Sequence, residues 1–190
     1  MSLQTWQETL VTLQTDGTAL GNTITATSLF GATTVAAAQG RFTLPANFFT
    51  VGRTIRVTAK GRISNIVTTP GTFTPSIRFG AVTVFTGGAV PLNIVAKTNV
   101  SFILDAMLTC RTIGGGTTAT VLGIGQLTSE SVLSSAAGVA NTCLLPASAP
   151  AAGTGFDSTT TNQVDIFGAW SIANAGNTIT LHSYMLESMN

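Results

Sequence analysis

Residues able to do acid–base, nucleophilic or metal chemistry are few in this chain. Its 190 residues include eight Lys or Arg, seven Asp or Glu, one His and two Cys, so that 8% are charged, against roughly 25% in an ordinary soluble protein. A Ser or Cys nucleophile would have to use His182 as its base. His182 is expected in the middle of a strand, on the same face as Tyr184, and no G-x-S-x-G phrase occurs. We therefore predict no catalytic residues and no enzymatic activity.

The carboxylates are scattered and form no evident catalytic pair. Glycoside hydrolysis needs two carboxyl groups flanking one bond, and only Asp105 and Asp165 lie centrally in strongly alternating segments. Each lies opposite the main apolar stripe of its segment. There a cross-strand basic partner is expected, with Arg56, Lys60 or Arg62 as candidates.

Two loops carry residue types that occur in ligand sites. Gly114, Gly115 and Gly116 suggest a phosphate-binding loop, but no Lys follows them, so a hairpin loop is predicted. Asp157 lies in a Ser/Thr-rich loop, where one carboxylate is too little for a cation site, and the chain has no D-x-D-x-D calcium motif. No metal and no cofactor are expected.

The two cysteines, Cys110 and Cys143, are far apart and have no C-x-x-C or His companion. Buried free thiols and a disulfide both remain open, whereas a metal site is not expected.

Half of the basic residues lie within ten positions, at Arg53, Arg56, Lys60 and Arg62. The last three share one face of a predicted strand. A solvated face, a contact with another protein subunit, and nucleic-acid binding are the three interpretations. No aromatic residue is interleaved for base stacking and the net charge is +1, so we expect no nucleic acid. The four residues form a candidate interface.

Alternation of apolar and polar residues with a period of two organises the chain and predicts half-buried strands. It is clear over residues 53–66 and 100–111. The outward face of the second segment is also partly apolar, so we expect this strand to be covered on both sides. Residues 164–172 and 178–187, joined by an Asn/Gly-rich turn at 174–177, predict a hairpin. Shorter candidate strands are Ile24–Leu29, Thr74–Phe79, Ala81–Phe85 and Ala119–Leu127.

Eight to ten strands with turn signals between them favour an all-β fold, an antiparallel jelly-roll-like β-sandwich in a single domain. Residues 1–22 are assigned to an N-terminal arm or first strand, where helical spacing of apolar residues competes with β-branched neighbours. Residues 23–190 are assigned to the jelly roll. Within it, residues 129–161 predict a long Ala/Ser/Gly/Pro-rich loop with a short helical turn near 131–137.

The start of the chain has no basic segment followed by an apolar core, and no run of 18 apolar residues occurs. No signal peptide and no membrane span are therefore predicted, and a protein made in the cytoplasm is expected.

The segment from Phe42 to Gly61 reads FTLPANFFTVGRTIRVTAKG. This phrase, F-x-L/I-P-A-N followed by V-G-x-T-I/L-R and a strand, resembles small jelly-roll proteins of tailed-bacteriophage virions. Residues 170–181 are similar to the last hairpin of such proteins. The resemblance implies a protein of the virion head surface, often a homotrimer, such as a capsid decoration (cement) protein bound to the major capsid protein. It implies no catalytic residues.

The same phrase has a physical interpretation. Pro45 and Gly52 bracket a loop that Phe48, Phe49 and Val51 are expected to hold against the edge of the sandwich. Gly52 would allow the chain to turn into the strand that follows.

Capsid decoration is thus the leading functional hypothesis. The alternative is a tail-tip or fibre module that binds a host glycan, with Trp6, Trp170 and Tyr184 as the available stacking groups. A coat protein of a small RNA virus is disfavoured, because residues 1–40 contain no Lys or Arg.

Overall fold

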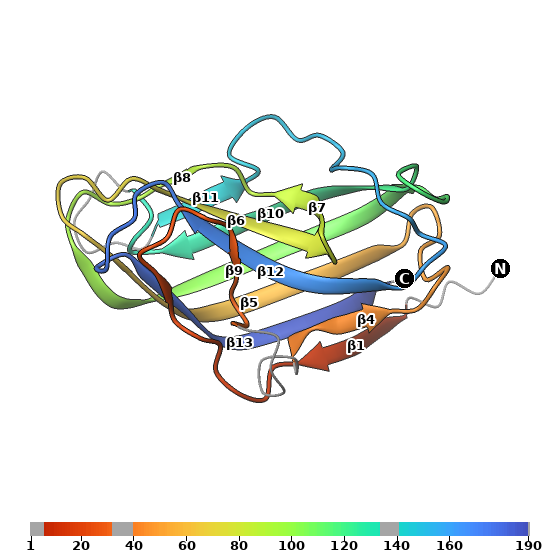
Figure 1. Cartoon of the computed structure of the whole chain (residues 1–190), viewed down its shortest axis with the longest axis horizontal. Helices are drawn as coiled ribbons and strands as arrows, with labels where there is room; N and C mark the ends of the chain where they lie inside the picture. Colours follow the sequence, from red (N-terminus) through yellow and green to blue (C-terminus); the bar gives the residue numbers. More distant parts are fainter. Residues whose placement is uncertain (1–5, 32–39, 134–140, 190) are drawn as a thin grey trace.

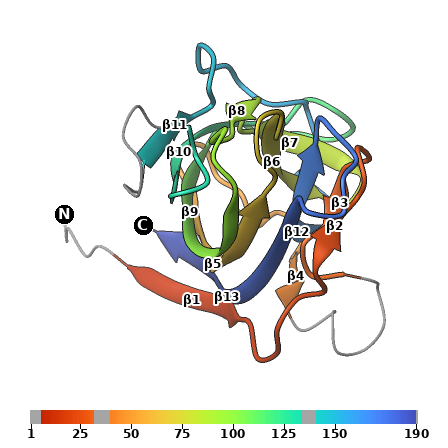
Figure 2. The ribbon, with the colours of Figure 1, turned by 90° about the vertical axis from the view of Figure 1, so that its left-hand side faces the viewer.

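Two antiparallel β-sheets pack face to face in the computed structural model, which describes residues 6–31, 40–133 and 141–189. Figure 1 shows the long strands running across the molecule, and Figure 2 shows the two sheets enclosing the core between them. The described residues contain no α-helix. The predicted all-β, jelly-roll-like sandwich is confirmed.

Sheet A is the larger sheet, with the strand order β1-β13-β5-β9-β10-β11 and with β2 also paired to β13. Its strands are β1 (Gln7–Thr12), β2 (Leu20–Gly21), β5 (Thr54–Asn65), β9 (Lys97–Thr112), β10 (Thr120–Ser129), β11 (Asn141–Leu145) and β13 (Thr178–Met189).

Sheet B has the order β3-β12-β6-β7, with β4 paired to β12 and β8 paired to β6. Its strands are β3 (Thr27–Ser28), β4 (Phe42–Leu44), β6 (Thr72–Phe79), β7 (Val82–Thr86), β8 (Val90–Pro91) and β12 (Asn162–Trp170).

The alternating pattern of β5 shows how each strand divides its side chains. Ile55, Val57 and Ala59 are fully buried between the sheets, whereas Arg56 and Lys60 point outward. Large side chains from both sheets fill the space between them. The largest of the fully buried side chains are Trp170, Tyr184, Phe30, Phe73, Phe102 and Phe156.

The loop between β4 and β5 is held by aromatic contacts. The ring centroid of Phe49 lies 5.4 Å from that of Phe79 and 5.3 Å from that of Phe156, and Phe48 packs edge-on against Phe49. Gly52 has a φ of +91°, a left-handed conformation that favours glycine. Val51, expected to help hold the loop, is instead 65% exposed.

Replacing Phe49 by Ala should lower the free energy of unfolding by about 3–5 kcal/mol, because it removes the shared ring of this aromatic cluster. Urea denaturation measures the change. Val51→Ala, in the same loop, should change it by less than about 0.5 kcal/mol. Equal effects of the two substitutions would contradict the assignment of the loop's anchor.

The N-terminal arm belongs to sheet A. β1 pairs with β13 from Gln7 opposite Met189 to Thr12 opposite Met185, and β2 pairs with the start of β13. Leu10 packs against the core from the strand conformation. The helical spacing of the apolar residues was therefore misleading over Gln7–Thr12, where edge pairing with β13 decides the structure.

The predicted hairpin of residues 164–187 is wrong, because β12 lies in sheet B and β13 in sheet A. The turn itself exists, closed by a hydrogen bond from the Asn177 amide to the Asn174 carbonyl. The buried side chain of Asn177 accepts a hydrogen bond from the Ile66 amide and donates one to the Pro70 carbonyl. The turn is thus a crossover between sheets, fixed to the connection between β5 and β6.

The segment 129–161, predicted to be loop, contains a strand. β11 pairs with β10 from Asn141 opposite Ser129 to Leu145 opposite Gly125. Its five residues are too few to show an alternating pattern, and the strand pairs along one side only. The helical turn expected near 131–137 falls largely outside the described residues. Residues 114–116 join β9 to β10, which confirms the hairpin loop.

Both cysteines are free thiols. Cys110 is fully buried and Cys143 is half-buried. Burial raises the pKa of both thiols, so neither has the character of a reactive thiolate.

Candidate protein-binding face

The outer face of sheet A is formed by the side chains of β5, β9, β10, β11 and β13 that point away from sheet B. Four large apolar side chains are exposed on it: Ile103 at 43%, Met107 at 42%, Ile124 at 54% and Leu144 at 72%. The strand over residues 100–111 was expected to be covered on both sides. No part of the described chain covers its outer side, so the apolar residues on that side face solvent.

Three of these residues line a shallow depression that we call the apolar hollow. Met107 lies directly opposite Ile124 on the neighbouring strand, and Leu144 lies opposite Gln126 one strand further. The depression has a volume of about 310 Å³ and is also lined by Arg56 and by the other residues Asp105, Gly125 and Gln126. It extends over four adjacent strands, β5, β9, β10 and β11, as a continuous apolar surface with a polar margin.

The polar margin is an ion pair between neighbouring strands. Arg56 Nε donates to Asp105 Oδ1 at 3.0 Å, and Nη2 donates to Asp105 Oδ2. The hydrogen bond and charge of Asp105 raise the pKa of Arg56, and Glu187, opposite Arg56 on β13, adds to this. The cross-strand basic partner expected for Asp105 is confirmed, and Arg56 is already engaged within the sheet.

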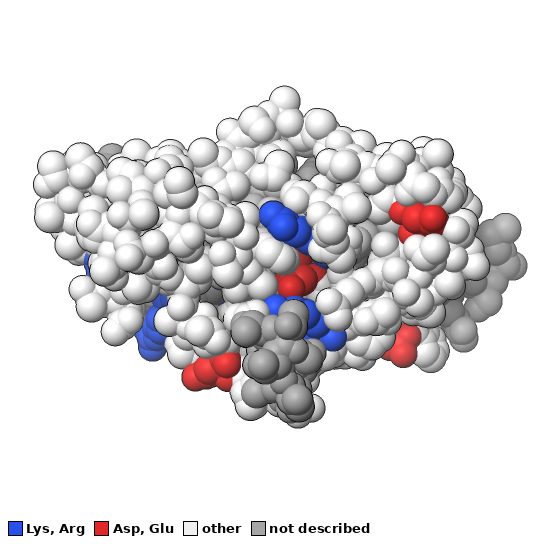
Figure 3. All heavy atoms as spheres, viewed as in Figure 1, with Lys and Arg blue, Asp and Glu red and all other residues white. Residues whose placement is uncertain are grey.

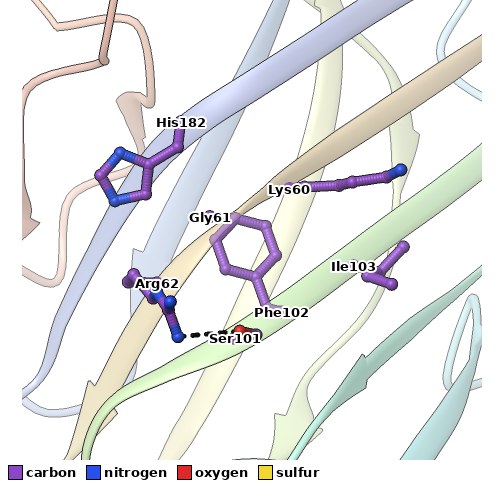
Figure 4. A pocket seen from close by; sticks show the side chains of 7 residues that line it. All are labelled: Lys60, Gly61, Arg62, Ser101, Phe102, Ile103 and His182. Atoms are coloured by element: carbon purple, nitrogen blue, oxygen red, sulfur yellow. Dashed lines mark hydrogen bonds between the residues drawn. The ribbon is translucent and has the colours of Figure 1, made fainter.

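A second depression, the basic hollow, lies further along β5 and has a volume of about 540 Å³. Lys60, Arg62 and His182 surround it, and Ile103 and Ser101 complete its margin, as Figure 4 shows. Arg62 Nη1 donates to Ser101 Oγ at 2.9 Å.

Gly61, between Lys60 and Arg62 on β5, also lines the basic hollow. A Cβ at Gly61 would collide with the carbonyl oxygen of Thr180 and approach the ring of Phe102 to 2.9 Å. No larger residue fits there without moving the neighbouring strand. Glycine at position 61 therefore lets β13 and the Phe102 ring lie close to β5 beneath the hollow.

His182 reaches this face through a β-bulge between Leu181 and Ser183. The extra residue shifts the alternation, so His182 is exposed while Tyr184 is buried in the core. The expectation that they share a face is therefore wrong. His182 Nδ1 lies 3.0 Å from Asp16 Oδ2.

Arg53, the fourth residue of the candidate interface, is not part of this face. Its Nη1 donates to the Phe48 carbonyl, and its guanidinium lies 4.8 Å from the centroid of the Phe48 ring. The structure brings together Arg56, Lys60 and Arg62 on the outer face and uses Arg53 to hold the β4–β5 loop.

Arg56→Glu should lower the free energy of unfolding by about 1–2 kcal/mol, because it places a third carboxylate between Asp105 and Glu187 at a half-exposed position. Lys60→Glu, two outward positions along β5, should change it by less than about 0.5 kcal/mol. Urea denaturation of both variants is the measurement. An Arg56→Glu variant as stable as Lys60→Glu would show that the ion pair does not stabilise the sheet.

A polar cleft of about 660 Å³ lies on the opposite face of the molecule, over sheet B. Arg41 Nε lies 2.6 Å from Asp165 Oδ2, and Ser28 Oγ donates to Asp165 Oδ1 at 2.7 Å. Burial raises the pKa of Asp165, while Arg41 and Ser28 oppose this shift. In Figure 3, acidic atoms lie between two groups of basic atoms near the middle of the face.

Sequence reasoning missed this cleft. Arg56, Lys60 or Arg62 had been expected to pair with Asp165, but its partner is Arg41, which precedes the short strand β4. Phe167 and Gln163 line the cleft from the same face of β12, and the Arg78 guanidinium lies 4.0 Å from the centroid of the Phe167 ring. The alternating pattern of β12 was the feature of the sequence that could have indicated this cleft.

Two of the three stacking groups proposed for glycan binding are in the core. Trp170 is 2% exposed and Tyr184 is 1% exposed, whereas Trp6 is 64% exposed. Among the described residues, no group of three or more His, Cys, Asp or Glu side chains could hold a metal ion. The described part of the chain also contains no helix that is long and apolar enough to cross a membrane.

No family model and no curated protein matches the chain. Among solved structures, it is similar to the CBM2 module of the evolved Dit protein of Lactobacillus casei BL23 phage J-1. That similarity has a TM-score of 0.40 and 12% sequence identity, over 99% of this chain and 98% of the other. Likeness at this level does not assign a function.

Proposed function

We propose that the chain is a non-catalytic structural protein of a tailed-phage virion that attaches to another virion protein through the outer face of sheet A. The observation that carries the proposal is the apolar hollow, formed by side chains that nothing in the described chain covers. Contiguous exposed apolar surface is a mark of protein–protein contact in soluble proteins.

The virion assignment is supported by the resemblance of the Phe42–Gly61 segment to phage jelly-roll proteins. In the structure, this segment forms β4, the aromatic loop and the first part of β5. The major capsid protein of the head shell is the partner to test first. Binding only to the assembled shell would stabilise that shell by mass action.

Replacing Ile124 and Leu144 together by Ser should weaken binding about tenfold, because each side chain loses apolar area that a partner would bury. Co-sedimentation with empty heads of the phage that encodes the chain measures binding. Both residues are exposed, so the fold should survive the changes.

The matched control is Val67→Ser with Ile94→Ser, which removes two apolar side chains, each 59% exposed, from loops outside the face. This control should bind like the unmodified protein. Equal losses in both double variants, or binding unchanged in Ile124→Ser with Leu144→Ser, would rule out the outer face as the attachment surface.

The cleft over sheet B favours a second candidate function, glycan binding by a tail-tip or fibre module. Its amide, guanidinium and carboxylate groups beside a half-buried aromatic ring are suited to sugar hydroxyls and a sugar face. Gln163→Ala with Phe167→Ala should abolish binding on a glycan array, while Gln126→Ala on sheet A should leave it intact. The absence of any array binding by the unmodified protein would remove this candidate.

A further inference from the structure

We propose that the partner presents an extended acidic–apolar segment to the outer face of sheet A. Its carboxylate would enter the basic hollow and an apolar side chain would enter the apolar hollow. This inference rests on the proposed attachment through the same face and names the chemistry of the partner.

The charge of the basic hollow favours a carboxylate. Lys60 is exposed and makes no hydrogen bond or ion pair with any described residue. Arg62 donates through Nη1 to Ser101 Oγ and to the Asn99 carbonyl, so Nη2 has no acceptor among the residues that the structure describes. Asp16, beside His182, is the one carboxylate paired at this hollow in the described chain. Guanidinium and ammonium groups bind carboxylates through charge-assisted hydrogen bonds.

The acids further along the face do not neutralise this hollow. Asp105 is held by Arg56, and Glu187 is buried and accepts a hydrogen bond from Gln7. Lys60 and Arg62 therefore form no ion pair with a described carboxylate, which makes the hollow complementary to a negative group.

The spacing of the two hollows fits an extended chain. Ile103 lines the basic hollow and Met107 lines the apolar hollow, four residues apart on the same side of β9. At about 3.3 Å per residue, they are separated by about 13 Å. A partner segment with Glu and Leu four positions apart in extended conformation spans the same distance.

The surroundings favour protein over nucleic acid. The basic hollow continues into apolar side chains, and the phenyl ring that lines it, Phe102, is buried at 2% exposure. His182, the other ring at the hollow, lies 3.0 Å from the Asp16 carboxylate, which would repel a phosphate backbone. Single-stranded nucleic acid needs exposed rings for base stacking. An apolar hollow beside a basic one matches a mixed protein surface instead.

The test is fluorescence anisotropy with labelled peptides of 12 residues, uncharged and polar except for Glu-x-x-x-Leu, Lys-x-x-x-Leu or Glu-x-x-x-Ser at their centre. The unmodified protein should bind Glu-x-x-x-Leu at least about tenfold more tightly than either of the others. Lys60→Glu with Arg62→Glu should reverse the preference and bind Lys-x-x-x-Leu more tightly. Arg111→Glu is the control, because Arg111 is an exposed residue of β9 that lines neither hollow. This variant should keep the original preference.

The charge reversal separates a binding role from a loss of fold, because an unfolded variant would bind no peptide selectively. Equal affinity for the Glu and Lys peptides, no binding of any peptide, or tighter binding of a single-stranded DNA oligonucleotide would each overturn this inference. So would self-association of the unmodified protein that buries this face. If the peptide test fails but the Ile124 and Leu144 double variant loses head binding, only the inferred partner chemistry is wrong and the proposed attachment stands. If that variant binds heads normally, the proposed attachment itself is wrong.

Discussion

The two-sided geometry of the β-strand is the constraint on which the rest of this structure depends. Successive side chains leave a strand on opposite sides, so placing Ile55, Val57 and Ala59 in the core commits Arg56 and Lys60 to the outside. Sheet B covers the inner face of sheet A and cannot cover its outer face. The apolar and basic hollows follow from which residues occupy those outward positions. The sandwich therefore determines which side chains are available on the face proposed for attachment.

The strand positions were predictable from the sequence wherever alternation was long and regular. β5, β9 and β10 lie close to the predicted segments, because one buried face imposes a pattern that can be seen locally. The pairing of strands was not predictable in the same way. The residues at 174–177 suit either a hairpin turn or a crossover between sheets. The contacts that favour the crossover are those of Asn177 with residues more than a hundred positions away. Short edge strands such as β11 also lack enough residues for a pattern.

The candidate site was predictable in part. The shared face of Arg56, Lys60 and Arg62 followed from alternation, and the structure adds that Asp105 engages the first of them. The bulge at His182 was not visible, because one extra residue reverses the alternation without changing composition. The Arg41–Asp165 pair joins a short strand to a central one, so its formation depends on the tertiary arrangement of sheet B. The exposure of Met107 and Ile124 likewise could not be predicted from the sequence, because it depends on whether another segment of the chain covers them.

The antiparallel pairing of β1 with β13 places Gln7 opposite Met189, at the end of the molecule where Figure 1 marks both termini. A pulling force applied at these two positions would act across the outermost hydrogen bonds of this ladder and break them in succession. This unzipping geometry resists force less than shearing, in which many hydrogen bonds share the load. Tension transmitted through the chain would therefore peel β1 from sheet A first, while β5, β9 and β10 kept the two hollows intact.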